Sequence, residues 1–197
     1  MEFVSKPAHT TVAFITTAAD VYKTKPWMEA DRQRFIDLGF QVEGYDIKDK
    51  TEESIYNDLR TKDIVFVSGG NTFYLLYHVR QSGFDKAIER VLEEGRQYVG
   101  SSAGSILVGP TIEPTKSLDN AEQAPRLDSF EGLGFVDFVI LPHYGTKKYE
   151  QRYQAIMEEW SPRVTLLPIS DRQLVVVEGS DHRVIEPSQT RHGAKQT

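Results

Sequence analysis

Residues 98–108 read YVGSSAGSILV: a short apolar strand, a turn of small residues and a second apolar stretch. Within them, residues 100–104 fit the pattern Gly-x-Ser-x-Gly, which is typical of a sharp turn from a strand into a helix. A side chain at either glycine would collide with neighbouring backbone. Such a turn exposes the hydroxyl of Ser102 above the sheet edge, and the amides at the start of the helix point towards developing negative charge. The stretch therefore predicts an α/β fold with a candidate nucleophile at Ser102.

Strands and helices alternate on both sides of this turn. We expect strands at 11–17, 41–45, 63–67, 98–100, 138–141, 164–167, 173–177 and 182–185. We expect helices at 26–38, 51–60, from 72 onward, at 84–95 and at 147–160. This order favours one mostly parallel sheet with helices on both faces.

The chain is long enough for one domain and too short for two ordinary ones, so we expect a single domain at 1–187 and a frayed tail at 188–197. The last two strands are predicted to form a hairpin through residues 178–181. Prolines and scattered charges in residues 111–131 indicate a long loop of functional or mobile character.

Composition excludes several classes of function. The net charge is −6 with both signs interspersed, which argues against a nucleic-acid partner. There are no cysteines, so disulfides, thiolate metal sites and a cysteine nucleophile are excluded. Residues 1–6 lack the pattern of a secretory signal, and no apolar run approaches the roughly 20 residues of a membrane span. We expect a cytoplasmic enzyme with no membrane contact.

A serine hydroxyl needs a base to become a good nucleophile. His143 directly follows the buried strand at 138–141, where the active sites of α/β proteins gather. The other histidines lie near the chain ends, inside a helix or beside the hairpin: His9, His192, His78 and His182. His143 is therefore the predicted base, and the alternative is a partly buried histidine bonded to backbone.

A second small-residue loop, SGGNT at 68–72, also follows a strand and opens a helix. The chain lacks the glycine patterns of the common phosphate-binding loops. The loop could instead complete an oxyanion hole, in which the amides of Gly70 and Ala103 share the oxygen of a tetrahedral intermediate. The alternative is a purely structural tight turn.

Taken together, these motifs resemble the peptidase E family of serine peptidases. The resemblance rests on four segments in family order over residues 60–180: GGNTF with Leu75 and Leu76 (69–76), GSSAG (100–104), GPTI (109–112) and PHY (142–144). It implies one α/β domain related to the glutamine amidotransferase-like fold, with Ser102 as nucleophile and His143 as base. It also implies hydrolysis of small peptides through an acyl-enzyme, with no metal or organic cofactor.

The family's third catalytic residue is an acid, often glutamate, in a loop after the strand that follows the histidine region. In this chain LPISD at 167–171 occupies that stretch, so the resemblance assigns the acid to Asp171, with Asp119 as the fallback. Its role would be to hold the imidazole in the required tautomer.

Substrate selection is expected to differ from that of the aspartyl dipeptidases. The aspartyl dipeptidases carry an arginine that pairs with the acidic side chain of the substrate. At the corresponding position this chain has Tyr149. Lys147, Lys148 or Arg152 could substitute, although lysine lacks the bidentate fork that suits a carboxylate. We predict substrate contacts at Asn71, Tyr149 and Arg152, and no strict preference for an N-terminal aspartate.

Two other functions remain open. A relative of the cyanophycinases would cut aspartyl–arginine units from a storage polymer, and activity on that polymer would reveal it. A binding module that has lost turnover would not react with a fluorophosphonate. An amidotransferase is disfavoured because its chemistry uses a cysteine. The expected partner is a small peptide under a roof formed by residues 111–131, and a homodimer is possible.

Overall fold

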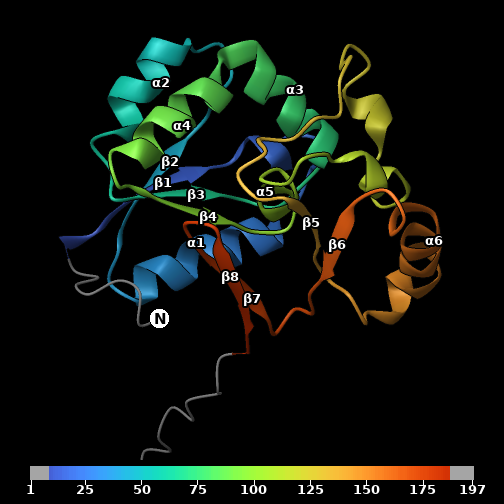
Figure 1. The fold of residues 1–197 in the computed structure, drawn as a ribbon. Helices are drawn as coiled ribbons and strands as arrows, with labels where there is room; N and C mark the ends of the chain where they lie inside the picture. The colour runs from blue at the N-terminus through green and yellow to red at the C-terminus, as the bar shows by residue number, and fades with distance from the viewer. Residues whose placement is uncertain (1–8, 187–197) are drawn as a thin grey trace, which may run out of the picture.

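The computed structural model describes residues 9–186, in which strands and helices alternate along the chain (Figure 1). The strands are β1 Thr11–Ile15, β2 Gln41–Tyr45, β3 Ile64–Val67, β4 Gln97–Gly100, β5 Phe138–Leu141, β6 Thr165–Pro168, β7 Leu174–Glu178 and β8 Asp181–Ile185. The helices are α1 Pro26–Asp37, α2 Glu52–Leu59, α3 Thr72–Ser82, α4 Phe84–Glu93, α5 Ala103–Ile106 and α6 Glu150–Trp160. In this part of the chain no helix is both long and apolar enough to span a bilayer. The predicted tail at 188–197 lies outside the described residues.

Parallel pairing dominates the strands, as predicted. β1 to β4 form a parallel sheet in the order β2-β1-β3-β4, and β5 pairs in parallel with β6. β7 and β8 form the predicted antiparallel hairpin. Among residues 9–186 the three groups are separate hydrogen-bonded ladders, whereas the sequence suggested one continuous sheet. Because parallel strands share a direction, the loops that follow β1, β3 and β4 leave from the same edge.

Helices cover both faces of the four-stranded sheet, and this explains the continuous apolar runs in β1 and β3. In β1, Ala13 and Ile15 face the cluster that includes the buried faces of α2, α3 and α4. Val12 and Phe14 point to the other face, against α1. Figure 1 shows the same arrangement, with α1 on one side of the sheet and α2, α3 and α4 on the other. A strand buried on both faces carries no polar alternation.

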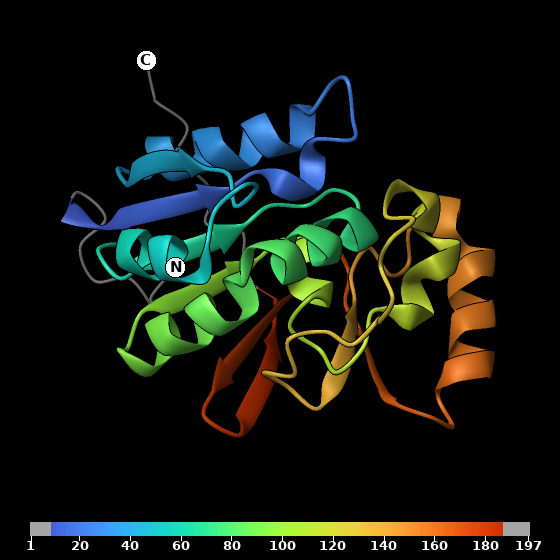
Figure 2. The ribbon, with the colours of Figure 1, turned by 90° about the horizontal axis from the view of Figure 1, so that it is seen from above.

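The β5–β6 pair is attached to the sheet through side chains. Phe138 of β5 shares a cluster with Tyr98 of β4 and Val175 of β7. On its other side, β5 packs against α6 through Leu141 and Tyr153. Figure 2 shows α6 at one end of the molecule, beyond β5 and β6 and away from α1. This packing brings the carboxyl end of β5 towards the turn after β4.

Residues 111–131, predicted as a long loop of functional or mobile character, contain short regular elements. A bridge pairs Thr111 with Glu131 at the base of the segment. Between them lie two short 3-10 helices, Glu113–Ser117 and Ala121–Gln123. Ile112 and Thr115 are fully buried. Both ribbon views place this segment beside α6 (Figures 1 and 2).

Candidate active site

Ser102 occupies a strained turn between β4 and α5. Its φ is +48° and its ψ is −108°, a conformation that L-residues rarely adopt outside functional sites. A Cβ on Gly100 would lie 2.4 Å from the carbonyl oxygen of Gly104, and one on Gly104 would lie 2.2 Å from that of Val67. Both positions therefore require glycine, as the sequence pattern predicts.

The helix after this turn is much shorter than the apolar sequence suggests. α5 is a single turn. Just beyond it, the backbone N–H of Gly109 donates to the carbonyl of Ile106, the last residue of the helix. Pro110 follows, and it could not continue a helix. Four residues have little macrodipole, so any stabilisation of negative charge here must come from individual N–H groups.

The loops after β5 and β6 lie side by side because the two strands pair in register. Leu141 pairs with Pro168, and Ile169 donates a backbone hydrogen bond of 3.0 Å to Leu141. Tyr144 in turn donates one of 2.9 Å to Ile169. His143 follows β5 and Asp171 follows β6. The backbone hydrogen bonds between the two loops therefore bring an imidazole and a carboxylate together.

The side chains of Ser102, His143 and Asp171 form one hydrogen-bonded chain. His143 Nε2 lies 3.0 Å from Ser102 Oγ, and His143 Nδ1 lies 2.6 Å from Asp171 Oδ1. The exposed fractions of the His143 and Asp171 side chains are 42% and 63%, so the chain of bonds lies at the surface. A serine bonded to an imidazole that is bonded to a carboxylate is the arrangement that activates a hydroxyl for nucleophilic attack.

The backbone at His143 is also held in an unusual conformation. Its φ is +65°, in the left-handed region. The buried Tyr153 of α6 donates its hydroxyl to the carbonyl of Pro142, just before the histidine. Strain of this kind persists only where the surroundings fix the backbone, and it is concentrated at functional sites.

Residues 68–71 pass close to the nucleophile turn. A Cβ on Gly69 would lie 3.1 Å from the Cβ of Ser102. Gly70 has a φ of +156° and packs so tightly that a Cβ would lie 2.1 Å from the carbonyl oxygen of Ala18. Among residues 9–186, no hydrogen bond uses the N–H of Gly70 or of Ala103. Two backbone donors near Ser102 are thus left for a ligand.

Of the three residues predicted to contact substrate, Asn71 has a side chain that is buried and hydrogen-bonded within the protein. It is 1% exposed, its Oδ1 accepts from Tyr74 N at 2.9 Å, and its Nδ2 donates to the carbonyl of Asn120 at 2.9 Å. The Asn71 side chain therefore caps α3. Tyr149 lies nearer the reactive groups, with its ring centroid 6.3 Å from that of His143. Arg152 is exposed in the first turn of α6.

Asp119, the fallback acid, binds Thr72 at the start of α3. Its Oδ2 accepts from the backbone N–H of Thr72 at 2.9 Å and from its hydroxyl at 2.6 Å. Burial raises the pKa of Asp119, and the bonds from Thr72 and the nearby His143 oppose the rise. The carboxylate that contacts the imidazole is that of Asp171. Within residues 9–186, no group of three or more acidic or histidine side chains could hold a metal ion.

Two residues of α1 reach the site although the sequence analysis assigned them only to a helix. The indole Nε1 of Trp27 donates to the carbonyl oxygen of Gly69 at 3.3 Å. The carboxylate of Asp31 accepts from the hydroxyl of Ser101 at 3.3 Å. The one available signal was the tryptophan itself, a large aromatic residue in the first turn of a helix that has few buried positions.

Comparison with known proteins identifies the family of the chain. The sequence profile of peptidase family S51 matches residues 1–185. An uncharacterised peptidase of Listeria monocytogenes is 33% identical over 91% of this chain and 88% of its own. A Drosophila melanogaster protein assigned as an alpha-aspartyl dipeptidase is 40% identical, over 54% of this chain and 41% of its own. The crystal structure of a Listeria monocytogenes protein assigned to peptidase E superposes with a TM-score of 0.88 at 33% identity, covering 95% of this chain and 91% of the other. The chain is therefore a serine-type peptidase and belongs to peptidase family S51.

Proposed function

We propose that this peptidase hydrolyses dipeptides or short peptides through an acyl-enzyme, with Ser102 as nucleophile, His143 as general base and Asp171 as its orienting acid. The observation that carries the proposal is the unbroken chain of hydrogen bonds from Ser102 Oγ through both nitrogens of His143 to Asp171. The N–H groups of Gly70 and Ala103, which have no acceptor within residues 9–186, support it, because acyl transfer needs donors for an oxyanion.

In the proposed reaction, His143 Nε2 takes the proton of the Ser102 hydroxyl as Oγ attacks the scissile carbonyl carbon. The carbonyl π bond opens onto oxygen, and the N–H groups of Gly70 and Ala103 stabilise that oxyanion. His143 then gives its proton to the leaving nitrogen as the C–N bond breaks, which leaves an ester on Ser102. Water, deprotonated by His143, hydrolyses the ester and restores the hydroxyl.

Replacing Asp171 by asparagine is expected to lower kcat by about 10³- to 10⁴-fold, because an amide in this place favours the wrong imidazole tautomer. The bond of 2.6 Å to His143 Nδ1 is the contact that changes. Steady-state kinetics on a cleaved dipeptide measure the effect. Asp181→Asn is the matched control, since Asp181 is an exposed carboxylate on the β7–β8 hairpin. Equal kcat values for the two variants would contradict the role of Asp171.

We further propose that the substrate's first side chain is accepted without strict selection for aspartate. The aromatic ring of Tyr149 lies beside His143, and the amino group of Lys148 lies 4.9 Å from the centre of that ring. The ammonium group of a lysine beside an aromatic ring does not form a bidentate site for a carboxylate. The Drosophila relative assigned as an alpha-aspartyl dipeptidase leaves aspartyl dipeptides among the substrates to be tested.

A panel of dipeptides that share the second residue and differ in the first tests this selectivity. We expect kcat/KM for aspartyl, alanyl and phenylalanyl dipeptides to fall within about tenfold of one another, as expected where no buried charge pair discriminates. N-acetylated copies and an aspartyl–arginine polymer complete the panel. A preference above a hundredfold for aspartate would contradict the proposal, and activity on the polymer alone would favour a cyanophycinase-like enzyme instead.

The homodimer and the cytoplasmic location stay predictions, and the proposed reaction calls for no cofactor. The peptide substrate is consistent with family S51. Gel filtration with light scattering of the full chain would determine the oligomeric state.

A further inference from the structure

We infer that helix α1 is a positioning element for the oxyanion-binding amides, acting through Trp27 and Asp31. This inference rests on the proposed roles of Ser102, Gly70 and Ala103. Among residues 9–186 no hydrogen bond joins either α1 residue to the triad, yet each is hydrogen-bonded to one of the two loops that carry an oxyanion donor. One loop follows β3 and the other follows β4, and both are hydrogen-bonded to α1.

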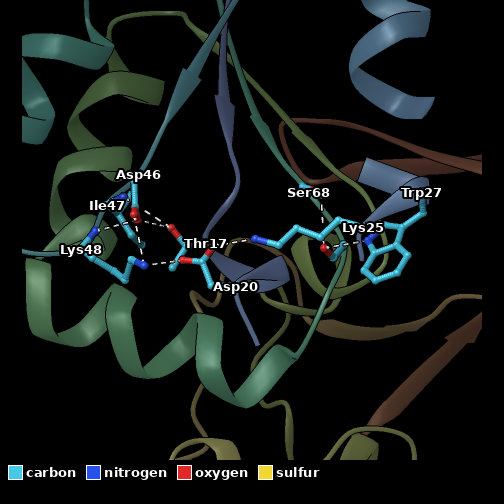
Figure 3. A network of polar contacts seen from close by, with 9 residues as sticks. Thr17, Asp20, Lys25, Trp27, Asp46, Ile47, Lys48 and Ser68 are labelled. Atoms are coloured by element: carbon cyan, nitrogen blue, oxygen red, sulfur yellow. Dashed lines mark hydrogen bonds and ion pairs between the residues drawn. The ribbon is translucent and has the colours of Figure 1, made fainter. Parts of the chain in front are cut away.

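Trp27 fixes the peptide unit that contains the first donor. Its indole N–H and the hydroxyl of Ser68 both donate to the carbonyl oxygen of Gly69, at 3.3 and 3.4 Å (Figure 3). The N–H of Gly70 belongs to the same planar peptide, on the side opposite that oxygen. Holding the oxygen towards α1 therefore holds the Gly70 N–H away from it. Glycine on both sides of a peptide lowers the steric barrier to its rotation, so hydrogen bonds to the carbonyl oxygen add to the restraint that packing provides.

Asp31 holds the second loop. Its Oδ2 accepts the hydroxyl of Ser101, the residue before the nucleophile, while the backbone N–H of Ser101 donates to Val67 at 2.9 Å. Residues 27 and 31 are four apart and therefore lie on the same face of a helix. One face of α1 thus contacts both loops.

α1 is itself rigidly anchored. Met28 and Phe35 are buried against the aromatic side chains of β1 and β3. At the start of the helix, Lys25 pairs with Asp20 at 3.0 Å, and Asp20 also pairs with Lys48, which lies just beyond β2 (Figure 3). Positions fixed by packing and by such networks are what a preorganised donor requires, because it must not reorient during the reaction.

Burial alone does not account for Trp27. The residue is 38% exposed and meets the ring of Tyr22 edge-on at a centroid distance of 5.2 Å. An exposed ring pair of this kind could be formed by phenylalanine equally well. The property that only tryptophan supplies here is the N–H that reaches Gly69, and this property can be removed without removing the ring.

Trp27→Phe tests the inference, with Trp160→Phe as the matched control on α6. We expect kcat of Trp27→Phe to fall about tenfold, less than the 10²- to 10³-fold cost of removing an oxyanion donor outright. KM should stay within about twofold, because the bond acts on the transition state. Affinity for a peptide aldehyde, which forms a tetrahedral adduct with an oxyanion, should fall by the same factor as kcat/KM. Trp160→Phe should match the wild type in all three.

Two further variants separate positioning from loss of structure. Replacing Trp27 by benzothienylalanine keeps the two-ring shape and removes only the N–H, so it should show the same loss in kcat with an unchanged melting temperature. Asp31→Ala should lose activity several-fold, whereas Asp31→Asn should recover most of it, because the amide oxygen can still accept from Ser101.

Ser102→Ala, measured in parallel, distinguishes failure of the proposed function from failure of the positioning role. Full activity in Ser102→Ala would overturn the proposed function itself. If Ser102→Ala is inactive while both Trp27 variants keep wild-type kcat and aldehyde affinity, the positioning role of α1 is wrong. A fall in melting temperature with an unchanged kcat for the folded fraction would also overturn it, by reducing Trp27 to a packing residue.

Discussion

Replacing Ser102 by alanine is expected to lower kcat by about 10⁵- to 10⁶-fold, as removal of the nucleophile does in other serine peptidases. The reason is that no other hydroxyl has an imidazole nitrogen at 3.0 Å that is oriented in turn by a carboxylate, within the part of the chain that the structure describes. Without the Oγ atom no acyl-enzyme forms, and the remaining groups can only polarise a bound carbonyl. Residual turnover reports that polarisation alone.

The measurement is steady-state hydrolysis of a dipeptide together with labelling by a fluorophosphonate, which reacts quickly only with an activated serine. Ser117→Ala is the matched control, because Ser117 is an exposed hydroxyl on a short 3-10 helix. The wild type and Ser117→Ala should be labelled on Ser102, and Ser102→Ala should not. Labelling on another residue, with activity retained in Ser102→Ala, would move the nucleophile elsewhere.

Much of the fold follows from local sequence, because burial leaves a clear mark on it. β1 and β3 are buried on both faces, so residues 11–15 and 64–67 are almost entirely apolar and were predicted as strands. The separate ladders were not predictable, since strand pairing depends on contacts between distant segments. The one-turn α5 was not predictable either: its apolar continuation, Leu107 and Val108, packs into the core without being helical.

Some residues of the site could likewise be predicted from the sequence, and others could not. Ser102 is predicted by the Gly-x-Ser-x-Gly turn, and His143 by its place after a strand, because parallel strands deliver such residues to a common edge. Asp171 is predicted by the resemblance to the peptidase E family. Asn71 was predicted to bind substrate, yet its side chain is buried and caps α3. Trp27 was not predicted, because its role depends on a carbonyl that is 42 positions away in the chain. Sequence patterns indicate chemistry at strand ends more readily than support from a neighbouring helix.

Replacing His143 by glycine is expected to lower kcat by about 10⁶-fold, a loss comparable to that of the nucleophile, because hydroxyl and base act as a unit. Glycine is the informative choice here. The backbone of His143 has a φ of +65°, which glycine adopts without steric cost, so the loop after β5 should keep its path. His182 lies in a strand, so glycine there would be a poor comparison. His182 is exposed, and His182→Gln serves as the histidine control and should retain activity.

Free imidazole should restore part of the activity of His143→Gly, and this rescue identifies the missing group chemically. The native ring is 42% exposed, so the space it leaves opens to solvent and can admit a free imidazole. That molecule can bond Ser102 on one side and Asp171 on the other, as the tethered ring does at 3.0 and 2.6 Å. Rescue should therefore saturate with imidazole and be abolished by adding Ser102→Ala. It should weaken when Asp171→Asn is added, because the carboxylate no longer orients the ring. Rescue that is equally strong in the Asp171→Asn background would show that the acid does not act through the imidazole, whatever the distance between them.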